Sequence, residues 1–418
     1  MKEILPRTIA SQTVNVPGSK SISHRMVISA ALASQTSVLT NVLESEDVLL
    51  TIDALKSMGA DIRKSASATY TITGFNGTPK APAKEIYLGN SGTSMRLLAG
   101  ISSLGNAPII LTGDPRMCER PMNELMDSLN VIGIDASSEN NTGTPPVKIC
   151  GGNRQGGRTT IDCSRSSQYL SALLMIGPFF ENGLTVELHQ KPVSAPYIDL
   201  TMDIMAQFGV TAERVSDTKY HVPGKQTYQS RNAFVEPDIS NSGYFWAAGA
   251  ISGVPVFVNN ITTHSLQGDL KLIHHFERMG CRLIFRDDSI GVAGEQLKGI
   301  HVDMSDTPDA VPALAIVAAF AKGETRISNI AHLREKECDR IDAVVTQLQK
   351  MGIHTDQGQD YMIIQGGSPH GADIETYNDH RIAMSFAVSG LRTQGVHIEN
   401  PGCVAKSFPN FWEVFDQL

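Results

Sequence analysis

This chain of 418 residues lacks long apolar runs, paired cysteines and an excess of positive charge. No apolar run reaches the ~18 residues that cross a bilayer, and the start lacks a basic and then apolar export signal. The six cysteines form no Cys-x-x-Cys pair, which disfavours a disulfide framework or a zinc site and favours reduced thiols. A net charge of −8 argues against a nucleic-acid binder, which needs cations to neutralise phosphates. We therefore expect a cytoplasmic protein with no membrane or nucleic-acid partner, no metal and no cofactor.

One pattern recurs six times along the chain. Each copy has a polar cluster, an apolar helix of small residues, a glycine turn and a β-branched strand, with the helices expected at residues 23–33, 93–103, 168–180, 243–252, 310–321 and 380–391. The following strands start at steps of 69 to 76 residues, near Ser37, Pro108, Leu184, Pro255, Glu324 and Val396. So regular a period indicates a duplicated supersecondary unit.

A second, amphipathic helix is expected in each copy, because apolar residues recur at helical spacing after each strand, as at Val48, Ile52 and Leu55. Five of these helices should end where a left-handed turn costs least, at Gly59, Gly133, Gly209, Gly280 and Gly352. A strand-like segment follows each glycine. The unit is thus predicted to be of βαβαββ type, in an α/β protein.

The sixth amphipathic helix, at residues 408–418, lacks the closing glycine and strand. Residues 3–16 are the obvious donor of the missing strand, so both termini should lie in one domain. We therefore expect three units per domain, with residues 1–19 plus 237–418 in one domain and 20–236 in the other.

Basic residues gather at the polar starts of the small-residue helices, as Lys20, Arg25, Arg96 and Arg381 do. A helix start carries unpaired N–H groups and partial positive charge, but one such end contributes only about 0.3–1 kcal/mol at an exposed site. Several ends with Arg and Lys are needed together. An acidic protein with local cationic clusters is therefore suited to binding a small anion.

Each polar cluster also has a purely structural explanation. Serines before a helix are common caps, and so is an acidic residue such as Asp309. The alternating charges of residues 334–340 are typical of a solvated surface. The recurrence of such clusters at equivalent places in six units favours binding.

Several segments carry a family resemblance that extends over essentially the whole chain. They are Lys20-Ser21-Ile22-Ser23-His24-Arg25, Leu88-Gly89-Asn90-Ser91-Gly92-Thr93, Arg120-Pro121-Met122, Lys336-Glu337-Cys338-Asp339-Arg340 and Asn378-Asp379-His380-Arg381. Together they resemble the signatures of the 5-enolpyruvylshikimate-3-phosphate synthase family. The resemblance implies a two-domain enolpyruvyl transferase fold with the active site in a cleft between domains that closes on its substrates. It also implies transfer of the enolpyruvyl group of phosphoenolpyruvate to the 5-hydroxyl of shikimate 3-phosphate, by addition and elimination through a tetrahedral intermediate.

The resemblance assigns roles by motif match. Phosphoenolpyruvate binding falls to Lys20, Gly92, Arg120, Gln168, Arg340, Arg381 and Lys406. Shikimate 3-phosphate binding falls to Ser21, Arg25, Ser166, Ser167, Gln168, Ser194, Tyr197, Asp309, His332 and Lys336. Asp309 is expected to accept the 5-hydroxyl proton, Glu337 to deliver and recover the methylene proton, and Lys20 to assist the departing phosphate. A monomer is expected, and the retained Gly92 favours binding of the herbicide glyphosate.

Two alternatives remain at this point. The related transferase acting on UDP-N-acetylglucosamine shares fold and donor, but it relies on a loop cysteine farther before its Arg-Pro than Cys118 lies before Arg120. A non-catalytic phosphometabolite-binding protein would bind the anions and release no phosphate. Leu97, Ser167 and His332 depart from residues found in some members of the resembling family.

Overall fold

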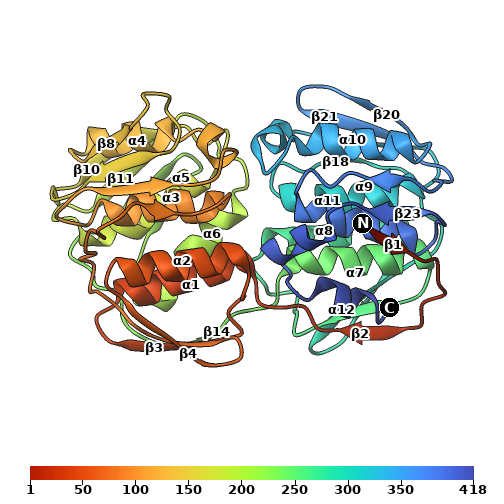
Figure 1. The fold of residues 1–418 in the computed structure, drawn as a ribbon, viewed down its shortest axis with the longest axis horizontal. Helices are drawn as coiled ribbons and strands as arrows, with labels where there is room; N and C mark the ends of the chain where they lie inside the picture. The colour runs from red at the N-terminus through yellow and green to blue at the C-terminus, as the bar shows by residue number, and fades with distance from the viewer. The chain divides into compact units, whose positions relative to one another are not determined.

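The computed structural model describes residues 1–418 and divides them into two compact units, each with its own hydrophobic core (Figure 1). The central domain is Gly18–Val235, and the terminal domain combines Met1–Pro17 with Glu236–Leu418. The boundaries expected from the sequence lie within two residues of these. No helix is both long and apolar enough to cross a membrane.

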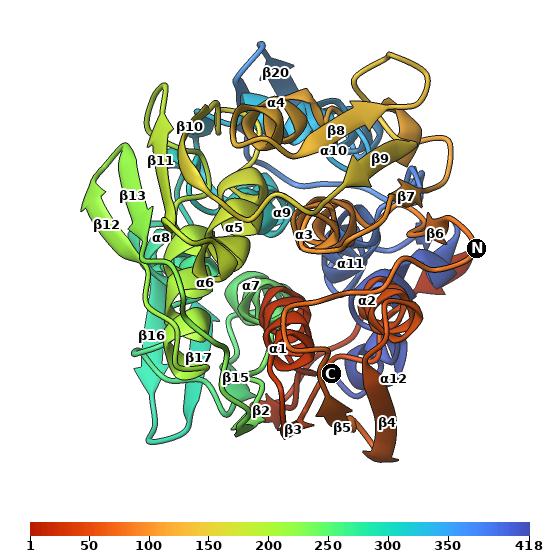
Figure 2. The ribbon, with the colours of Figure 1, turned by 90° about the vertical axis from the view of Figure 1, so that its left-hand side faces the viewer.

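The central domain contains three copies of the repeat. Its helices are α1 (Lys20–Leu32), α2 (Glu46–Ser57), α3 (Gly92–Ser102), α4 (Asn123–Val131), α5 (Gln168–Ile176) and α6 (Pro196–Gln207), with the 3-10 helices η1 (Met117–Glu119) and η2 (Gly177–Phe179). Its strands are β3 (Thr36–Thr40), β4 (Asp61–Ala66), β5 (Thr69–Thr73), β6 (Ile86–Tyr87), β7 (Ile109–Thr112), β8 (Asp135–Ser138), β9 (Val147–Cys150), β10 (Gly157–Ile161), β11 (Leu184–Leu188), β12 (Glu213–Ser216), β13 (Lys219–Val222) and β14 (Asn232–Phe234). The small-residue helices α1, α3 and α5 pack against one another or their neighbours inside the domain, with the sheets outside them (Figure 2).

The terminal domain holds the other three copies. Its helices are α7 (Ile239–Ser252), α8 (Lys271–Arg278), α9 (Val311–Ala319), α10 (Arg340–Lys350), α11 (His380–Gly390) and α12 (Phe411–Phe415), with η3 (Gly268–Leu270), η4 (Pro308–Ala310), η5 (Ala331–Glu335) and η6 (Pro401–Lys406). Its strands are β1 (Lys2–Ile4), β2 (Gln12–Val14), β15 (Val256–Asn259), β16 (Cys281–Phe285), β17 (Ser289–Gly294), β18 (His301–Asp303), β19 (Glu324–Ser328), β20 (His354–Gln357), β21 (Tyr361–Gln365), β22 (Asp373–Ile374) and β23 (Val396–Ile398).

All six sheets follow one plan. A first strand pairs in parallel with the strand that follows the small-residue helix, and a third strand then pairs antiparallel, as in the order β14-β3-β5-β4. Five sheets add a fourth strand, whereas the sixth, β1-β23-β22, has three. The common plan explains the period of the sequence. The five glycines expected to end amphipathic helices all have positive φ, between 78° and 107°.

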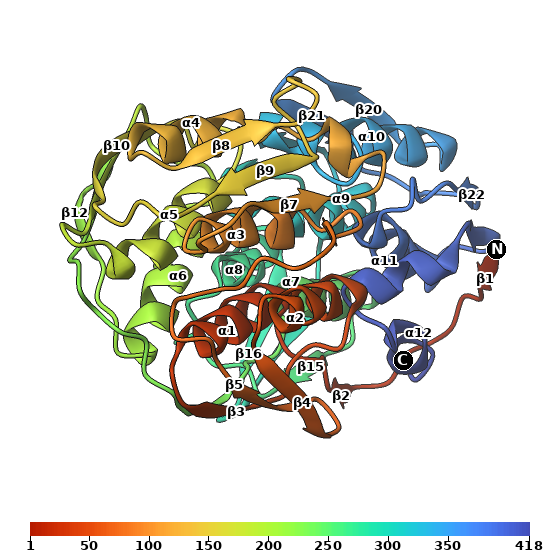
Figure 3. The ribbon, with the colours of Figure 1, turned by 60° about the vertical axis from the view of Figure 1, so that its left-hand side comes forward.

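The N-terminal segment serves two copies, where the sequence predicted one. Strand β1 runs antiparallel to β23 in the sixth copy, and β2 runs parallel to β15 in the fourth. The first copy in each domain starts just after the chain enters that domain, so its first strand must come from a distant part of the chain. Strand β14 takes this place beside β3 in the first copy, as β2 does beside β15 in the fourth. Lys2 also pairs with Asp416 at 2.9 Å, which holds the two termini together in this domain (Figure 3).

Three helices differ most from the predicted bounds. Helix α5 stops at Ile176 and continues as η2, because Pro178 cannot extend the α-helical hydrogen bonding. Helix α7 starts at Ile239, four residues before the expected 243, because Asp238 caps it by accepting a hydrogen bond from Asn241 N at 2.9 Å. The last helix is shorter than the predicted 408–418 and spans Phe411–Phe415.

Candidate active site

The start of α1 brings three predicted residues together in the central domain. Lys20 Nζ lies 3.3 Å from Asp47 Oδ2 in the first turn of α2. Arg25 is 1% exposed, and it donates hydrogen bonds to Ser21 O at 3.0 Å and to Thr201 Oγ1 at 2.7 Å. Burial lowers the pKa of the Arg25 guanidinium to about 10, so this side chain stays charged at neutral pH. A buried cation held by neutral partners is suited to an anionic ligand.

The starts of α3 and α5 meet through Gln168. Its Nε2 donates to Thr93 Oγ1 at 2.9 Å, and its Oε1 accepts from Arg96 Nη1 at 2.8 Å. Arg120 lies over the start of α3, where its Nη1 donates to Asn90 O at 3.3 Å and to Asn90 Oδ1 at 3.2 Å. A Cβ atom at Gly92 would stand only 2.5 Å from Arg120 Nη2, so the absence of a side chain there lets the guanidinium approach the helix start.

The serines expected to bind shikimate 3-phosphate lie at the starts of α5 and α6. Ser166 Oγ accepts a hydrogen bond from Gln168 N at 3.2 Å, and Ser166 and Ser167 are both buried. Ser194 has φ of 54°, in the left-handed region that costs a residue with a side chain about 1–3 kcal/mol. Tyr197 lies in the first turn of α6, and its carbonyl accepts from Arg25 Nη2 at 3.4 Å. These residues therefore connect with the start of α1.

The terminal domain centres on a buried arginine at the start of α10. Arg340 is 1% exposed and contacts three carboxylates: Asp379 Oδ2 through Nε, Asp309 Oδ1 through Nη1 and Glu337 Oε2 through Nη2, each at 2.8 Å. The carboxylates raise the pKa of Arg340 above its usual value against the opposing effect of burial. Both expected proton-transfer residues, Asp309 and Glu337, are thus held by one guanidinium.

Two further cations complete this array. Arg381 Nη2 lies 2.7 Å from Asp309 Oδ2, so Asp309 accepts from two arginines, one through each oxygen. Lys406 Nζ lies 3.7 Å from Glu337 Oε1. The predicted residues Asp309, Glu337, Arg340, Arg381 and Lys406 therefore form one connected set of charges.

His332 and Lys336 lie in the segment before α10. His332 is 5% exposed, and burial, followed by the charge of Lys336, lowers its pKa to about 3. Its imidazole is therefore neutral at physiological pH, and its ring nitrogens can hydrogen-bond a neutral hydroxyl group.

Helix starts differ between the two domains. In the terminal domain, Asp238, Asp339 and Asp379 cap α7, α10 and α11 by accepting backbone hydrogen bonds. In the central domain, the cap residues of α1 and α5, Ser19 and Ser167, make no such side-chain bond, whereas Ser91 caps α3 by accepting from Ser94 N at 3.4 Å. The sequence predicted several helix ends that bind an anion together; at α7 and α11 a carboxylate already accepts a hydrogen bond from one backbone N–H group of the first turn.

Residues 334–340 are not a solvated surface, although their alternating charges are typical of one. Arg340 is buried, and the Glu337 side chain is 11% exposed. Sequence reasoning also missed the partners that hold the site: Asp47, Thr93, Asp379 and Tyr244, whose Oη accepts from Arg381 Nη1 at 3.3 Å. Thr93 and Asp379 had a signal, since Thr93 ends the Leu-Gly-Asn-Ser-Gly-Thr motif and Asp379 stands in the Asn-Asp-His-Arg motif just before a helix.

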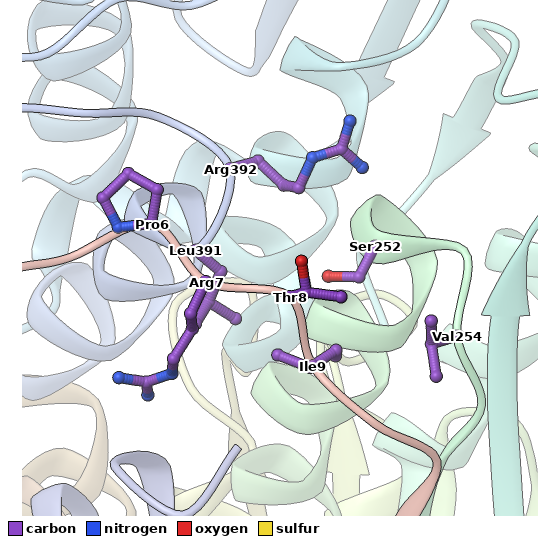
Figure 4. A pocket seen from close by; sticks show the side chains of 8 residues that line it. All are labelled: Pro6, Arg7, Thr8, Ile9, Ser252, Val254, Leu391 and Arg392. Atoms are coloured by element: carbon purple, nitrogen blue, oxygen red, sulfur yellow. The ribbon is translucent and has the colours of Figure 1, made fainter.

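A separate hollow of about 430 Å³ in the terminal domain contains none of the predicted residues (Figure 4). It is lined by Pro6, Arg7, Thr8, Ile9, Ser252, Val254, Leu391 and Arg392. Both arginines satisfy carbonyls at helix ends, Arg392 at Ile251 O of α7 (2.6 Å) and Arg7 at Phe415 O of α12 (2.7 Å). These contacts give the arginines a structural role as C-terminal caps.

Comparison with known proteins shows which family the chain belongs to. Residues 6–415 match the family model described as EPSP synthase (3-phosphoshikimate 1-carboxyvinyltransferase). The chain is 42% identical over 412 residues to the 3-phosphoshikimate 1-carboxyvinyltransferase of Serratia proteamaculans, covering 98% of this chain and 96% of that one. It is 40% identical over 408 residues to the enzyme of that name from Trichormus variabilis, with 97% and 96% covered. A solved structure of EPSP synthase from Acinetobacter baumannii superposes with a TM-score of 0.85 at 33% identity, over 99% of this chain and 97% of that one. The chain belongs to the EPSP synthase family.

Proposed function

We propose that this protein transfers the enolpyruvyl group of phosphoenolpyruvate to the 5-hydroxyl of shikimate 3-phosphate and releases phosphate, as a step of aromatic amino acid biosynthesis. The observation that carries the proposal is the array around Arg340, in which two carboxylates suited to proton transfer share arginines suited to a substrate carboxylate. The family match over nearly the whole chain agrees with it.

The central domain is proposed to hold phosphates and the shikimate ring. Lys20, Gly92, Arg120 and Gln168 would bind the phosphate of phosphoenolpyruvate, with Lys406 from the terminal domain. Ser21 and Arg25 would take the shikimate carboxylate. The shikimate phosphate would lie against the serines at the starts of α5 and α6 and against Lys336: Ser166, Ser167 and Ser194, beside Tyr197.

Arg340 and Arg381 are proposed to bind the carboxylate of phosphoenolpyruvate, because planar guanidinium groups match a carboxylate with paired hydrogen bonds. Without substrate these arginines hold Asp309 and Glu337. An incoming carboxylate competes for the same donors. Substrate binding would thus loosen the hold on the two acids at the moment when they are needed for proton transfer.

The chemistry then requires two proton carriers. Asp309 accepts the proton of the 5-hydroxyl as its oxygen adds to the substituted carbon of the enol, and Glu337 gives a proton to the methylene carbon. The resulting tetrahedral intermediate bears the phosphate and a methyl group. Glu337 recovers a methyl proton as the bond to phosphate breaks, and the phosphate leaves with the proton that Asp309 took from the hydroxyl, while Lys20 stabilises its charge. His332 would hydrogen-bond a hydroxyl of the shikimate ring.

Both domains supply cations to this proposed site, and both substrates carry several negative charges. We therefore propose that the substrates bind between the domains and draw them together, which excludes water from the intermediate. Small-angle scattering should show a more compact monomer when shikimate 3-phosphate is added. Identical profiles with and without it would contradict closure.

The protein is proposed to be cytoplasmic, because its six free thiols fit a compartment in which thiols stay reduced.

The test of the proposed function is phosphate release from phosphoenolpyruvate with either shikimate 3-phosphate or UDP-N-acetylglucosamine as acceptor. Release with the shikimate ester alone, and a product heavier by one enolpyruvyl group, is the expected result. Release with the nucleotide sugar would assign the sister activity instead. Binding of both substrates with no phosphate released would indicate a non-catalytic binding protein.

A further inference from the structure

One buried carboxyl group of the terminal domain has no part in the proposed mechanism. Asp269, in η3, is 2% exposed, and its Oδ2 accepts a hydrogen bond from the Oγ of Ser240 in the first turn of α7. A carboxylate is costly to bury, so its surroundings decide when it carries charge.

Helix α7 connects this carboxyl with the candidate active site. It packs against η3, which carries Asp269, against η4, which carries Asp309, and against α11, which carries Arg381. Tyr244 lies one turn after Ser240, on the same face of the helix. Its Oη accepts from Arg381 Nη1 at 3.3 Å, and Arg381 Nη2 binds Asp309 at 2.7 Å. The face that holds Asp269 therefore also holds Arg381.

Three charged groups on the packed elements act on Asp269 through space: Asp309 on η4, Arg381 on α11 and Asp238 at the cap of α7. Burial, and then the charge of Asp309, raise the pKa of Asp269 to about 7. The Ser240 hydrogen bond and Arg381 act in the opposite direction, and Asp238 adds to the rise. The carboxyl thus changes its charge near neutral pH, beside an arginine proposed to bind substrate.

We propose that Asp269 is a positioning residue whose charge sets how strongly Arg381 holds a ligand carboxylate. This inference rests on the proposed function, in which Arg381 binds the carboxylate of phosphoenolpyruvate. Protonated Asp269 leaves Arg381 to the ligand, whereas ionised Asp269 attracts the guanidinium and repels the ligand. Affinity for phosphoenolpyruvate therefore falls as the pH rises through neutrality.

The experiment compares the unchanged protein with Asp269→Asn between pH 6 and pH 8.5. Asparagine keeps an acceptor for Ser240 and cannot ionise. We expect KM for phosphoenolpyruvate to rise with pH up to about tenfold more in the unchanged protein, the factor that corresponds to a coupling of one pKa unit. At pH 6, where Asp269 is largely uncharged, the kcat at saturating substrate should be the same in both, because Asp269→Asn then removes no charge. Ionisation of the substrate phosphate affects both proteins equally and cancels in the comparison.

Ser240→Ala is the second variant. It keeps the carboxyl but removes the hydrogen bond that favours its ionised form, so the midpoint of the KM change should move to higher pH. If Asp269→Asn does not fold, as judged by thermal melting, this shift carries the test alone.

Parallel KM profiles for the unchanged protein and Asp269→Asn would overturn the inference while leaving the proposed function intact, and so would an unmoved midpoint in Ser240→Ala. Absence of phosphate release by the unchanged protein at every pH would instead refute the proposed function, and the inference with it. The two failures are therefore distinguishable.

Discussion

Replacing Gly92 with alanine should weaken phosphoenolpyruvate binding without destabilising the protein. The added Cβ would lie 2.5 Å from Arg120 Nη2 and 2.7 Å from its Cζ, which is too close for the guanidinium to stay. The clash is with the far end of a flexible side chain, so Arg120 moves and the backbone of α3 does not. Gly92 is the first residue of α3, where alanine is at least as good a helix former. Stability should therefore be unchanged or slightly higher.

The expected size of the effect follows from the contacts of Arg120. This guanidinium donates to Asn90 O at 3.3 Å and to Asn90 Oδ1 at 3.2 Å, and it is proposed to bind the substrate phosphate. Losing one charge-assisted hydrogen bond costs about 1.5–3 kcal/mol. At about 1.4 kcal/mol for each factor of ten, KM for phosphoenolpyruvate should rise by roughly 10- to 150-fold. Phosphate release at varied phosphoenolpyruvate concentration measures KM, and thermal melting measures stability.

Gly100, two turns along the same helix, provides the control. A Cβ there would stand 3.0 Å from Ala172 O and 3.1 Å from Ala172 Cβ, both in the adjacent helix α5. Gly100→Ala should therefore cost about 1–3 kcal/mol in overpacking while KM stays the same. A KM of Gly92→Ala within twofold of the unchanged protein, or a loss of stability as large as that of Gly100→Ala, would refute the prediction.

Three further predictions concern the terminal domain. Asp309→Asn and Glu337→Gln should each lower kcat by about 100-fold or more, since proton transfer is lost, and steady-state kinetics that show an unchanged kcat would remove that residue from the mechanism. Asp379→Ala should destabilise the protein by about 1.5–3 kcal/mol, because Arg340 loses one charge-assisted hydrogen-bond partner while Asp309 and Glu337 still pair with it; an unchanged urea midpoint would contradict this. Burial lowers the pKa of His332 to about 3, so the unfolded chain takes up a proton below pH 6.5 that the folded protein does not, and stability falls as the pH falls. His332→Asn should reduce the slope of stability against pH between 6.5 and 3 by up to about 1.4 kcal/mol per pH unit, and equal slopes in urea unfolding would refute this.

The repeat and the class of fold could be predicted from the sequence because they leave local signals. Apolar helices of small residues, strand starts at steps of 69 to 76 residues and glycines at helix ends are all visible without contacts. The five glycines have the positive φ that a left-handed helix end requires.

Long-range pairing left no such signal. Residues 12–14 look like any short strand, and only the sheet reveals that β2 belongs to the fourth copy, through its parallel pairing with β15. The ion pairs of Arg340 with Asp309 and Asp379 join residues 31 and 39 positions apart. The local hydrophobic pattern alone predicts that such charges lie on the surface, because burial of an ion pair depends on partners that are distant in the sequence.

Both domains are proposed to bind anionic groups, and their helix starts would do so in different ways. In the central domain, the cap residues of α1 and α5 are serines whose side chains make no capping bond, so hydroxyl groups stand beside backbone N–H groups at these helix starts. Such a mixture of donors suits the several oxygens of a phosphate. In the terminal domain, aspartates cap α10 and α11, and Arg340, the first residue of α10, and Arg381, the second residue of α11, pair with carboxylates. Because an internal carboxylate already occupies each guanidinium, an external carboxylate is the ligand that can replace it with the same geometry. Phosphates therefore suit the central domain and the carboxylate of phosphoenolpyruvate suits the terminal domain, in agreement with the proposed function.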